Sequence, residues 1–301
     1  MKSAVVGLVL AALVLPQRPA TPAADKISVS AEARAKQPGE LVVLTLSMPD
    51  ASAVPHVHAF DRVLLPYQVA PTTWRVLLGI DLETKPGTYA VTIDAGASRP
   101  AAKTTYSLAV RAKTFPTRTL NVDDAFVNPP ASAEARIASD AARLAEIWQH
   151  ASSAQLWLGP FVRPVPQQAN SAFGTRSVYN GQPRSPHSGA DFLSPAGTPV
   201  KAPNAGAIVL ADDLYYTGNT VVIDHGLGLF SLFAHLEKIN VKDGQRVATG
   251  DVVGLVGATG RVTGPHLHWM VRVGGARVDP LSLLAMLGAR ASGADPAAAS
   301  R

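Results

Sequence analysis

Two short motifs contain the residues of this chain whose types and spacing can do chemistry. His187 and Asp191 lie four positions apart, and a His-Leu-His triplet, His266 to His268, follows nearer the C-terminus. Imidazole and carboxylate groups from two such motifs can supply three ligands to one divalent metal. Zinc held by three protein groups keeps a fourth position open, whereas structural zinc is closed by four protein ligands. Water at an open position ionises near neutral pH, so the motifs predict a hydrolytic zinc site.

The local sequence around the motifs is compatible with convergence on one ion. Side chains two positions apart in a strand project to the same face, so His266 and His268 point the same way if 266–273 is extended. Only one of them needs to bind metal, and the other can serve as a hydrogen-bonding base. Small residues at 188–190 let the backbone bend between the other two donors. From the residues alone, a set of surface histidines on a β domain stays open as the alternative.

Three segments around these motifs resemble a known family. The segments 173–191, 233–235 and 260–268 are similar to the lysostaphin and LytM type of zinc peptidoglycan endopeptidase, in particular its exported branch from bacteria with an outer membrane. The resemblance covers about 159–290. It implies a compact antiparallel β fold with a groove across the metal, and hydrolysis of peptide cross-links in the cell wall.

The resemblance also assigns roles to five residues. In that family the His-x-x-x-Asp pair and the second histidine of His-x-His bind zinc, which implies one zinc ion on His187, Asp191 and His268. The family's two further catalytic histidines match His235 and His266. These two orient water, stabilise the oxyanion or pass a proton to the leaving amine, and the sequence does not divide these tasks between them.

Several other residues near the motifs have two interpretations each. Tyr179 is a candidate to assist the oxyanion, with a core aromatic as the alternative. Arg176, Arg184 and Arg261 flank the motifs and are candidates to bind substrate carboxylates, or are ordinary solvated arginines. His225, in an Asp-His-Gly turn, is expected to be structural.

Length and composition limit the possible classes of protein. The chain has 301 residues, enough for about two domains, and 47% of them are hydrophobic. It has no cysteine, which excludes disulfides, thiolate metal sites and a cysteine nucleophile. The formal net charge of +5 is small and scattered, so we expect no nucleic-acid partner.

The first residues have the pattern of an export signal, which we place at 1–24. A basic start precedes an apolar run from Ala4 to Leu15, and small residues follow at 20–24. The apolar run is too short to span a membrane comfortably, although an uncleaved anchor is the alternative. No other segment reaches about 18 consecutive apolar residues, so we expect a periplasmic or secreted protein with no stable membrane insertion after cleavage.

Residues 25–113 have the pattern of a β domain. Short runs of β-branched and alternating apolar residues are separated by Pro-Gly pairs, which predicts an immunoglobulin-like β-sandwich. His56 and His58 would share one strand face there. No partner carboxylate is evident and Pro55 indicates a loop or an edge, so a metal role is not favoured.

Residues 114–158 are expected to form a linker with an amphipathic helix. Ser132 is the expected N-cap, with Glu134 in the first turn. Apolar residues then recur at helical spacing between Ile137 and Ala151, which predicts one buried stripe packed on one domain or the other.

Residues 159–290 form the predicted zinc peptidase domain. Short apolar strands separated by glycine-containing turns predict an all-β, mainly antiparallel domain. A short closing helix is expected at 280–287, and 291–301 are expected to be a flexible tail.

Two other functions remain open from the sequence. One is a non-catalytic envelope regulator that uses the same fold, such as an amidase activator. The other is a zinc enzyme that cuts a different exported substrate, such as a glycine-rich protein. The complete set of three ligand residues and two further histidines favours the enzyme that acts on peptidoglycan, so peptidoglycan is the expected partner.

Overall fold

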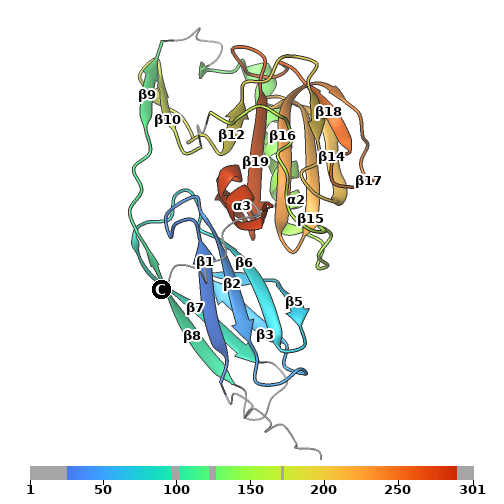
Figure 1. The fold of residues 1–301 in the computed structure, drawn as a ribbon. Helices are drawn as coiled ribbons and strands as arrows, with labels where there is room; N and C mark the ends of the chain where they lie inside the picture. The colour runs from blue at the N-terminus through green and yellow to red at the C-terminus, as the bar shows by residue number, and fades with distance from the viewer. Residues whose placement is uncertain (1–25, 96–101, 122–126, 171–172, 290–301) are drawn as a thin grey trace, which may run out of the picture.

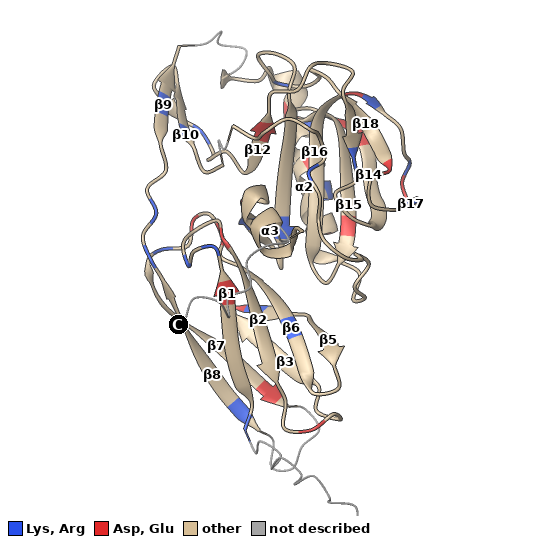
Figure 2. Ribbon diagram, viewed as in Figure 1, with Lys and Arg blue, Asp and Glu red and all other residues tan. Residues whose placement is uncertain are grey.

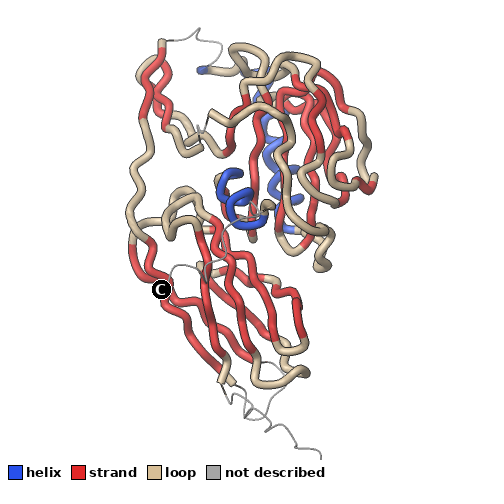
Figure 3. The backbone as a smooth tube through the Cα atoms, viewed as in Figure 1, coloured by secondary structure: helices blue, strands red, loops and turns tan. Residues whose placement is uncertain are grey.

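The computed structural model describes residues 26–95, 102–121, 127–170 and 173–289. These residues form an almost entirely β structure with an N-terminal sandwich and a larger C-terminal sheet (Figure 1, Figure 3). The expected signal at 1–24 and the expected tail at 291–301 lie outside them. Within the described ranges, none of the helices combines the length and the hydropathy that crossing a membrane requires.

The N-terminal part is a sandwich of two antiparallel sheets. Its strands are β1 (Ser28–Ala33), β2 (Leu41–Ser47), β3 (Pro55–Ala59), β4 (Arg62–Leu64), β5 (Pro66–Ala70), β6 (Thr73–Gly79), β7 (Gly87–Ala95) and β8 (Lys103–Val110). One sheet has the strand order β1-β2-β6-β5 and the other β4-β3-β7-β8. Alternate residues point inward, as in β3, and form one apolar core between the sheets. The two packed sheets match the predicted β-sandwich, while the immunoglobulin-like topology stays a prediction.

Strand β3 departs from what its sequence indicated. It lies between β4 and β7, so the expectation of a loop or an edge is wrong. Pro55 is the first residue of the strand, where the missing N–H costs no ladder hydrogen bond. His56 and His58 point outward, and His56 Nδ1 lies 3.3 Å from Asp94 Oδ1 on the neighbouring strand.

The C-terminal part is built on a nine-stranded antiparallel sheet. Its strands are β12 (Gly189–Phe192), β13 (Pro199–Lys201), β14 (Gly206–Leu214), β15 (Gly218–Gly226), β16 (Leu229–Ile239), β17 (Arg246–Val247), β18 (Val252–Val256), β19 (Leu267–Val273) and β20 (Ala276–Val278). The main path runs β12-β19-β16-β15-β14-β17. Fully buried aromatic residues fill one side, with the rings of Phe233 and Trp269 stacked at 6.3 Å. This confirms the predicted antiparallel β domain.

A small third sheet joins the linker to this domain. It contains β9 (Thr117–Leu120), β10 (Arg176–Tyr179) and β11 (Gln182–Pro183). Strand β9 pairs in parallel with β10, and the two run side by side at one edge of the molecule (Figure 1). Phe115 precedes β9 and packs edge-on against Phe173 at 6.4 Å. The linker therefore contributes a strand as well as the expected helix.

The predicted amphipathic helix is α2 (Glu134–Gln149), which follows a 3₁₀ turn at Ala131–Ala133. Leu144, Trp148 and Ala151 of the predicted stripe pack on the large sheet, where Trp148 contacts the ring of Phe230 at 5.2 Å. The helix therefore belongs to the C-terminal part. The expected Ser132 cap is wrong, because Ala133 occupies the N-cap position and no side chain caps the helix.

The sandwich and the large sheet meet at an interface with charged residues of both signs. Figure 2 marks the positions of the basic and acidic residues along the ribbon. Arg277 at the end of the large sheet donates hydrogen bonds to Asp81 at 2.7 and 3.1 Å. Arg34 bridges Glu40 and Asp279, the latter at the start of helix α3 (Pro280–Leu287). One apolar cluster contains residues of both parts, among them Leu41, Val43, Leu77, Val278 and Leu283.

Candidate metal centre

Neighbouring strands position two of the three candidate ligands. Asp191 in β12 lies directly opposite His268 in β19 in the antiparallel register. His187 lies just before β12. Its backbone is fixed by two hydrogen bonds, one donated to the Thr175 carbonyl at 3.0 Å and one accepted from the Gly174 N–H at 2.7 Å.

The three side chains converge at a single point. Their donor atoms are the only group of three or more potential ligands found together among the described residues. His187 Nε2 lies 3.0 Å from His268 Nδ1 and 3.1 Å from Asp191 Oδ1, and the third edge of the triangle is 2.9 Å. A tetrahedral zinc ion with bonds of roughly 2.05 Å holds its ligand atoms about 3.3 Å apart. The donor set therefore fits zinc with only a small expansion.

Gly189 makes room for this convergence. A Cβ atom at Gly189 would lie 2.6 to 2.7 Å from two atoms of the His268 ring and 2.5 Å from the Trp269 carbonyl oxygen. Any side chain at this position would push the ring away from the other donors. The glycine of the His-Ser-Gly-Ala-Asp segment thus allows the ring of His268 to lie against the backbone of β12.

The protonation states favour metal binding. Burial alone would raise the pKa of Asp191, but hydrogen bonds with His187 and His268 hold it well below the usual value. Burial also lowers the pKa of His268. An ionised carboxylate and a neutral imidazole are the forms that can donate electron pairs to a metal.

His235 reaches the site through an irregularity in β16. The pairing of β15 with β16 shifts register between Asn219 and Val221, and His235 adopts a left-handed backbone with φ of 64°. Such a bulge redirects a side chain out of the normal alternation. The His235 Nδ1 lies 2.9 Å from the Thr259 carbonyl, and burial lowers the pKa of His235 to about 3, with the neighbouring His268 as the next largest cause.

His266 lies beside His235 and is held in the same way. Its Nδ1 lies 2.9 Å from the Gly264 carbonyl, and the two imidazole rings are 5.0 Å apart. A carbonyl only accepts hydrogen bonds, so Nδ1 carries the proton in each neutral ring and Nε2 keeps the free electron pair. The His266 Nε2 is 3.8 Å from Asp191 Oδ1, which directs this electron pair toward the three donors.

A groove of about 500 Å³ contains all five residues. Of the other residues singled out from the sequence, Tyr179, Arg184 and Arg261 line this groove, whereas Arg176 does not. Tyr179 is half-buried in the groove wall. His225 lies in the core, where it contacts the Ala205 carbonyl and the Ser231 hydroxyl.

Several residues that line the groove were not predicted from the sequence. Arg118 and Leu120 come from the linker strand β9, and Tyr216 and Thr217 come from the turn between β14 and β15. The linker residues carry no motif, and their position depends on pairing with a strand far along the chain. The two aromatic residues at 215–216, next to a glycine turn, were the only signal that could have marked the second segment.

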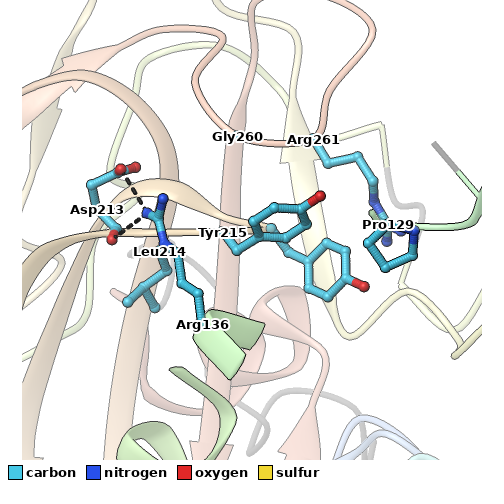
Figure 4. A pocket seen from close by; sticks show the side chains of 8 residues that line it. Pro129, Arg136, Asp213, Leu214, Tyr215, Gly260 and Arg261 are labelled. Carbon is cyan, nitrogen blue, oxygen red and sulfur yellow. Dashed lines mark hydrogen bonds and ion pairs between the residues drawn. The ribbon is translucent and has the colours of Figure 1, made fainter. Parts of the chain in front are cut away.

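A second hollow of about 410 Å³ adjoins the groove and shares Tyr216 and Arg261 with it. Figure 4 shows Arg136 and Asp213 joined on one side of Tyr215, with Arg261 on the other side. The Arg261 guanidinium lies over the Tyr216 ring at 4.3 Å. These stacked groups line both the hollow and the groove.

An open set of two imidazoles and one carboxylate, with two more histidines beside it, is typical of a metal-dependent hydrolase. The model of peptidase family M23 matches residues 185–280, which contain the five site residues. A crystal structure of a putative M23 peptidase from Pseudomonas aeruginosa is 33% identical and covers 84% of this chain and 96% of its own, with a TM-score of 0.66. The chain therefore belongs to peptidase family M23. The likeness to that structure extends well beyond the matched segment.

Two curated relatives have named activities. The peptidoglycan DD-endopeptidase ShyA of Vibrio cholerae is 48% identical over 96 residues, which cover 32% of this chain and 22% of that protein. The DD-carboxypeptidase/endopeptidase Mpg of Neisseria meningitidis is 43% identical over 97 residues, with the same coverage of 32% and 22%. The chain thus matches about a fifth of the length of these relatives.

Proposed function

We propose that this protein is a zinc-dependent endopeptidase that hydrolyses peptide cross-links of peptidoglycan. The observation that carries the proposal is the convergence of His187, Asp191 and His268 in an open groove, with His235 and His266 beside them. The named activities of ShyA and Mpg support peptidoglycan as the substrate. A non-catalytic regulator would need neither the three donors nor the two histidines.

In this mechanism His187, Asp191 and His268 would hold one zinc ion. A bound zinc ion would act as a Lewis acid that polarises the scissile carbonyl and lowers the pKa of water. His235 and His266 act at Nε2, where each can accept the proton of the attacking water and deliver a proton to the leaving amine. The Thr259 and Gly264 carbonyls hold the Nδ1 side of each ring, so each Nε2 keeps its direction.

We also infer that the protein acts outside the cytoplasm, in the periplasm or after secretion. Two features support this location. The first 24 residues have the pattern of an export signal, and the proposed substrate is a polymer of the cell envelope.

The test uses residues 25–301, purified with zinc and incubated with cross-linked sacculi. The proposal expects release of uncrosslinked muropeptides, loss of this release on chelation, and recovery when zinc is restored. The His268→Ala variant is the matched control for contaminating hydrolases. A protein that binds stoichiometric zinc but leaves sacculi uncut would contradict the proposal. A protein that purifies without zinc and leaves sacculi intact would favour the envelope regulator instead.

A further inference from the structure

We infer that the linker strand β9 and the β10–β11 hairpin form a carboxylate-binding subsite of the groove, in which Arg118 and Arg184 bind an acidic group of the substrate peptide. This inference rests on the proposed function for the identity of the polymer. It adds a substrate contact that lies outside the segment matched by the family model, 185–280.

The two arginines lie in one row across the small sheet. Arg118 of β9 is the register partner of Ser177 in β10. On the other side of β10, the Arg184 N–H donates to the Ser177 carbonyl at 2.8 Å, which continues the pairing of β10 with β11. Side chains of residues paired in this way project to the same face of a sheet. Ser177 is therefore flanked by two arginines.

The face that carries this row is the one that lines the groove. Arg118 and Leu120 of β9, Ser177 and Tyr179 of β10, and Arg184 all line it, whereas the alternate residues 117, 119, 176 and 178 do not. This alternation is what a strand pair with one face toward a groove requires. Arg184 also precedes the candidate ligand His187 by three residues, so the row lies beside the metal centre.

The guanidinium groups of this row have no acidic partner in the part of the chain that the structure describes. Neither Arg118 nor Arg184 forms a salt bridge with any described carboxylate. The Arg118 Nε donates to the Ser177 hydroxyl at 3.0 Å, and one Arg184 Nη donates to the Gln182 side chain at 3.0 Å. The Arg184 Nε is buried and has no hydrogen-bond partner among the described residues.

The described lining of the groove is basic. Of the described residues that line it, Asp191 is the only acidic one, and its carboxylate is committed to the three-donor cluster. Arg261 adds a third guanidinium. A low-dielectric wall lined by one sign of charge attracts ligands of the opposite sign.

The chemistry of the row fits a carboxylate. A guanidinium is a planar fork that binds a carboxylate through two parallel hydrogen bonds, each stronger than a bond between neutral groups. Leu120 lies next to Arg118 on the same face and is 40% exposed, which offers an apolar contact beside the charge. This combination fits a cross-linked stem peptide with free carboxylates, and gives no advantage to an uncharged glycine bridge.

Binding is measured first, because it does not depend on turnover. The zinc-loaded His266→Ala chain is titrated calorimetrically with a soluble cross-linked muropeptide dimer, and with the same dimer after its carboxylates are amidated. Adding Arg118→Gln or Arg184→Gln should weaken binding of the acidic dimer by roughly 10-fold, the scale of a lost charge-assisted hydrogen bond, and leave the amidated dimer unaffected.

Arg176→Gln is the matched control, because Arg176 lies in the same sheet but on the face that does not line the groove. It should bind both dimers as the parent does. Arg118→Lys and Arg184→Lys keep the charge and should restore part of the lost affinity. If either arginine had only a structural role, its Gln variant would have a lower melting temperature and would bind both dimers more weakly to the same extent.

Cleavage by the otherwise unchanged chain gives a second readout. The Gln variants should raise KM for the acidic dimer by roughly 10-fold and change kcat little, since a positioning contact is made in the ground state as well. Equal affinity of the parent for acidic and amidated dimers, or an unchanged preference in both Gln variants, would overturn the subsite. Failure to cut sacculi would overturn the proposed function, while the binding result would still decide the subsite.

Discussion

Asp191 and His268 lie directly opposite each other in β12 and β19, and the Asp191 Oδ1 and His268 Nδ1 atoms are 2.9 Å apart. The pairing of two strands therefore positions two candidate ligands at once. A slip of one residue would turn one side chain to the other face of the sheet. The buried aromatic residues on the core side of β12 and β19, Phe192 and Trp269, oppose such a slip.

The first prediction concerns the division between metal ligands and other histidines. His187→Ala and His268→Ala remove one corner of the donor triangle, so both should lose bound zinc and activity. His235→Ala should keep stoichiometric zinc, because no donor is removed. Loss of a residue that only supports a ligand lowers metal affinity roughly 10–100-fold. His187→Ala and His268→Ala should lower zinc affinity by more than this. Zinc content by mass spectrometry checks this, and equal zinc loss in all three variants would contradict it.

The second prediction concerns His266. Its Nε2 points toward the donors while its Nδ1 is held by the Gly264 carbonyl. His266→Ala should lower kcat by about 10²–10⁴-fold, the usual contribution of a general acid or base, with zinc retained. His150→Ala, an exposed histidine at the end of α2, is the control and should keep full activity. A His266→Ala enzyme with near-normal kcat would exclude His266 from proton transfer.

The third prediction concerns the interface between the sandwich and the large sheet at low pH. Burial opposes ionisation of Asp81, but hydrogen bonds with Arg277 outweigh it and lower the pKa of Asp81 from 3.8 to about 2. A depressed pKa in the folded state stabilises the fold above the unfolded-state pKa, and this stabilisation is lost as the pH falls toward about 2. The contribution at neutral pH is about 2 kcal/mol.

Urea unfolding of the wild type and of Asp81→Asn checks this. The difference in the free energy of unfolding should be largest near pH 7 and should shrink between about pH 4 and pH 2. Asp61→Asn, an exposed carboxylate of the same sandwich, should show little difference at any pH. A difference for Asp81→Asn that does not change with pH would argue against an ionic origin.

The fourth prediction concerns the close approach at Gly79. A Cβ atom there would lie 2.8 Å from the Ala276 Cβ and 2.9 Å from the Val273 carbonyl oxygen. Gly79→Ala should therefore lower the free energy of unfolding by about 1–3 kcal/mol through overpacking. Gly264→Ala is the same substitution at a site with no neighbour within 4 Å, and should change stability by less than about 0.5 kcal/mol. Equal melting temperatures for the two variants would show that the atoms around Gly79 can shift to accommodate the added methyl group.

Much of the C-terminal fold could be predicted from local pattern. The runs at 207–210, 220–223 and 229–233 are apolar and bounded by turns, and they are strands β14 to β16 in the structure. The closing helix expected at 280–287 is α3. These elements follow from hydrophobic periodicity and turn residues, which act over a few positions.

The remaining features depend on contacts between distant segments. Strand β9 has four exposed residues and no apolar alternation, so nothing local marks it as a strand. It forms only because β10 offers a parallel partner more than fifty positions later in the chain. The turn of His235 into the groove likewise depends on a register shift between β15 and β16.

The position of β9 has a consequence for how related enzymes diversify. One side of the groove is contributed by residues that precede the matched segment 185–280, while the candidate metal centre lies within that segment. If the proposed subsite is correct, a change in the linker strand can alter substrate preference without changing the five candidate site residues. A fragment trimmed to the shared segment would keep the five candidate site residues and lose the part of the groove wall that Arg118 and Leu120 form.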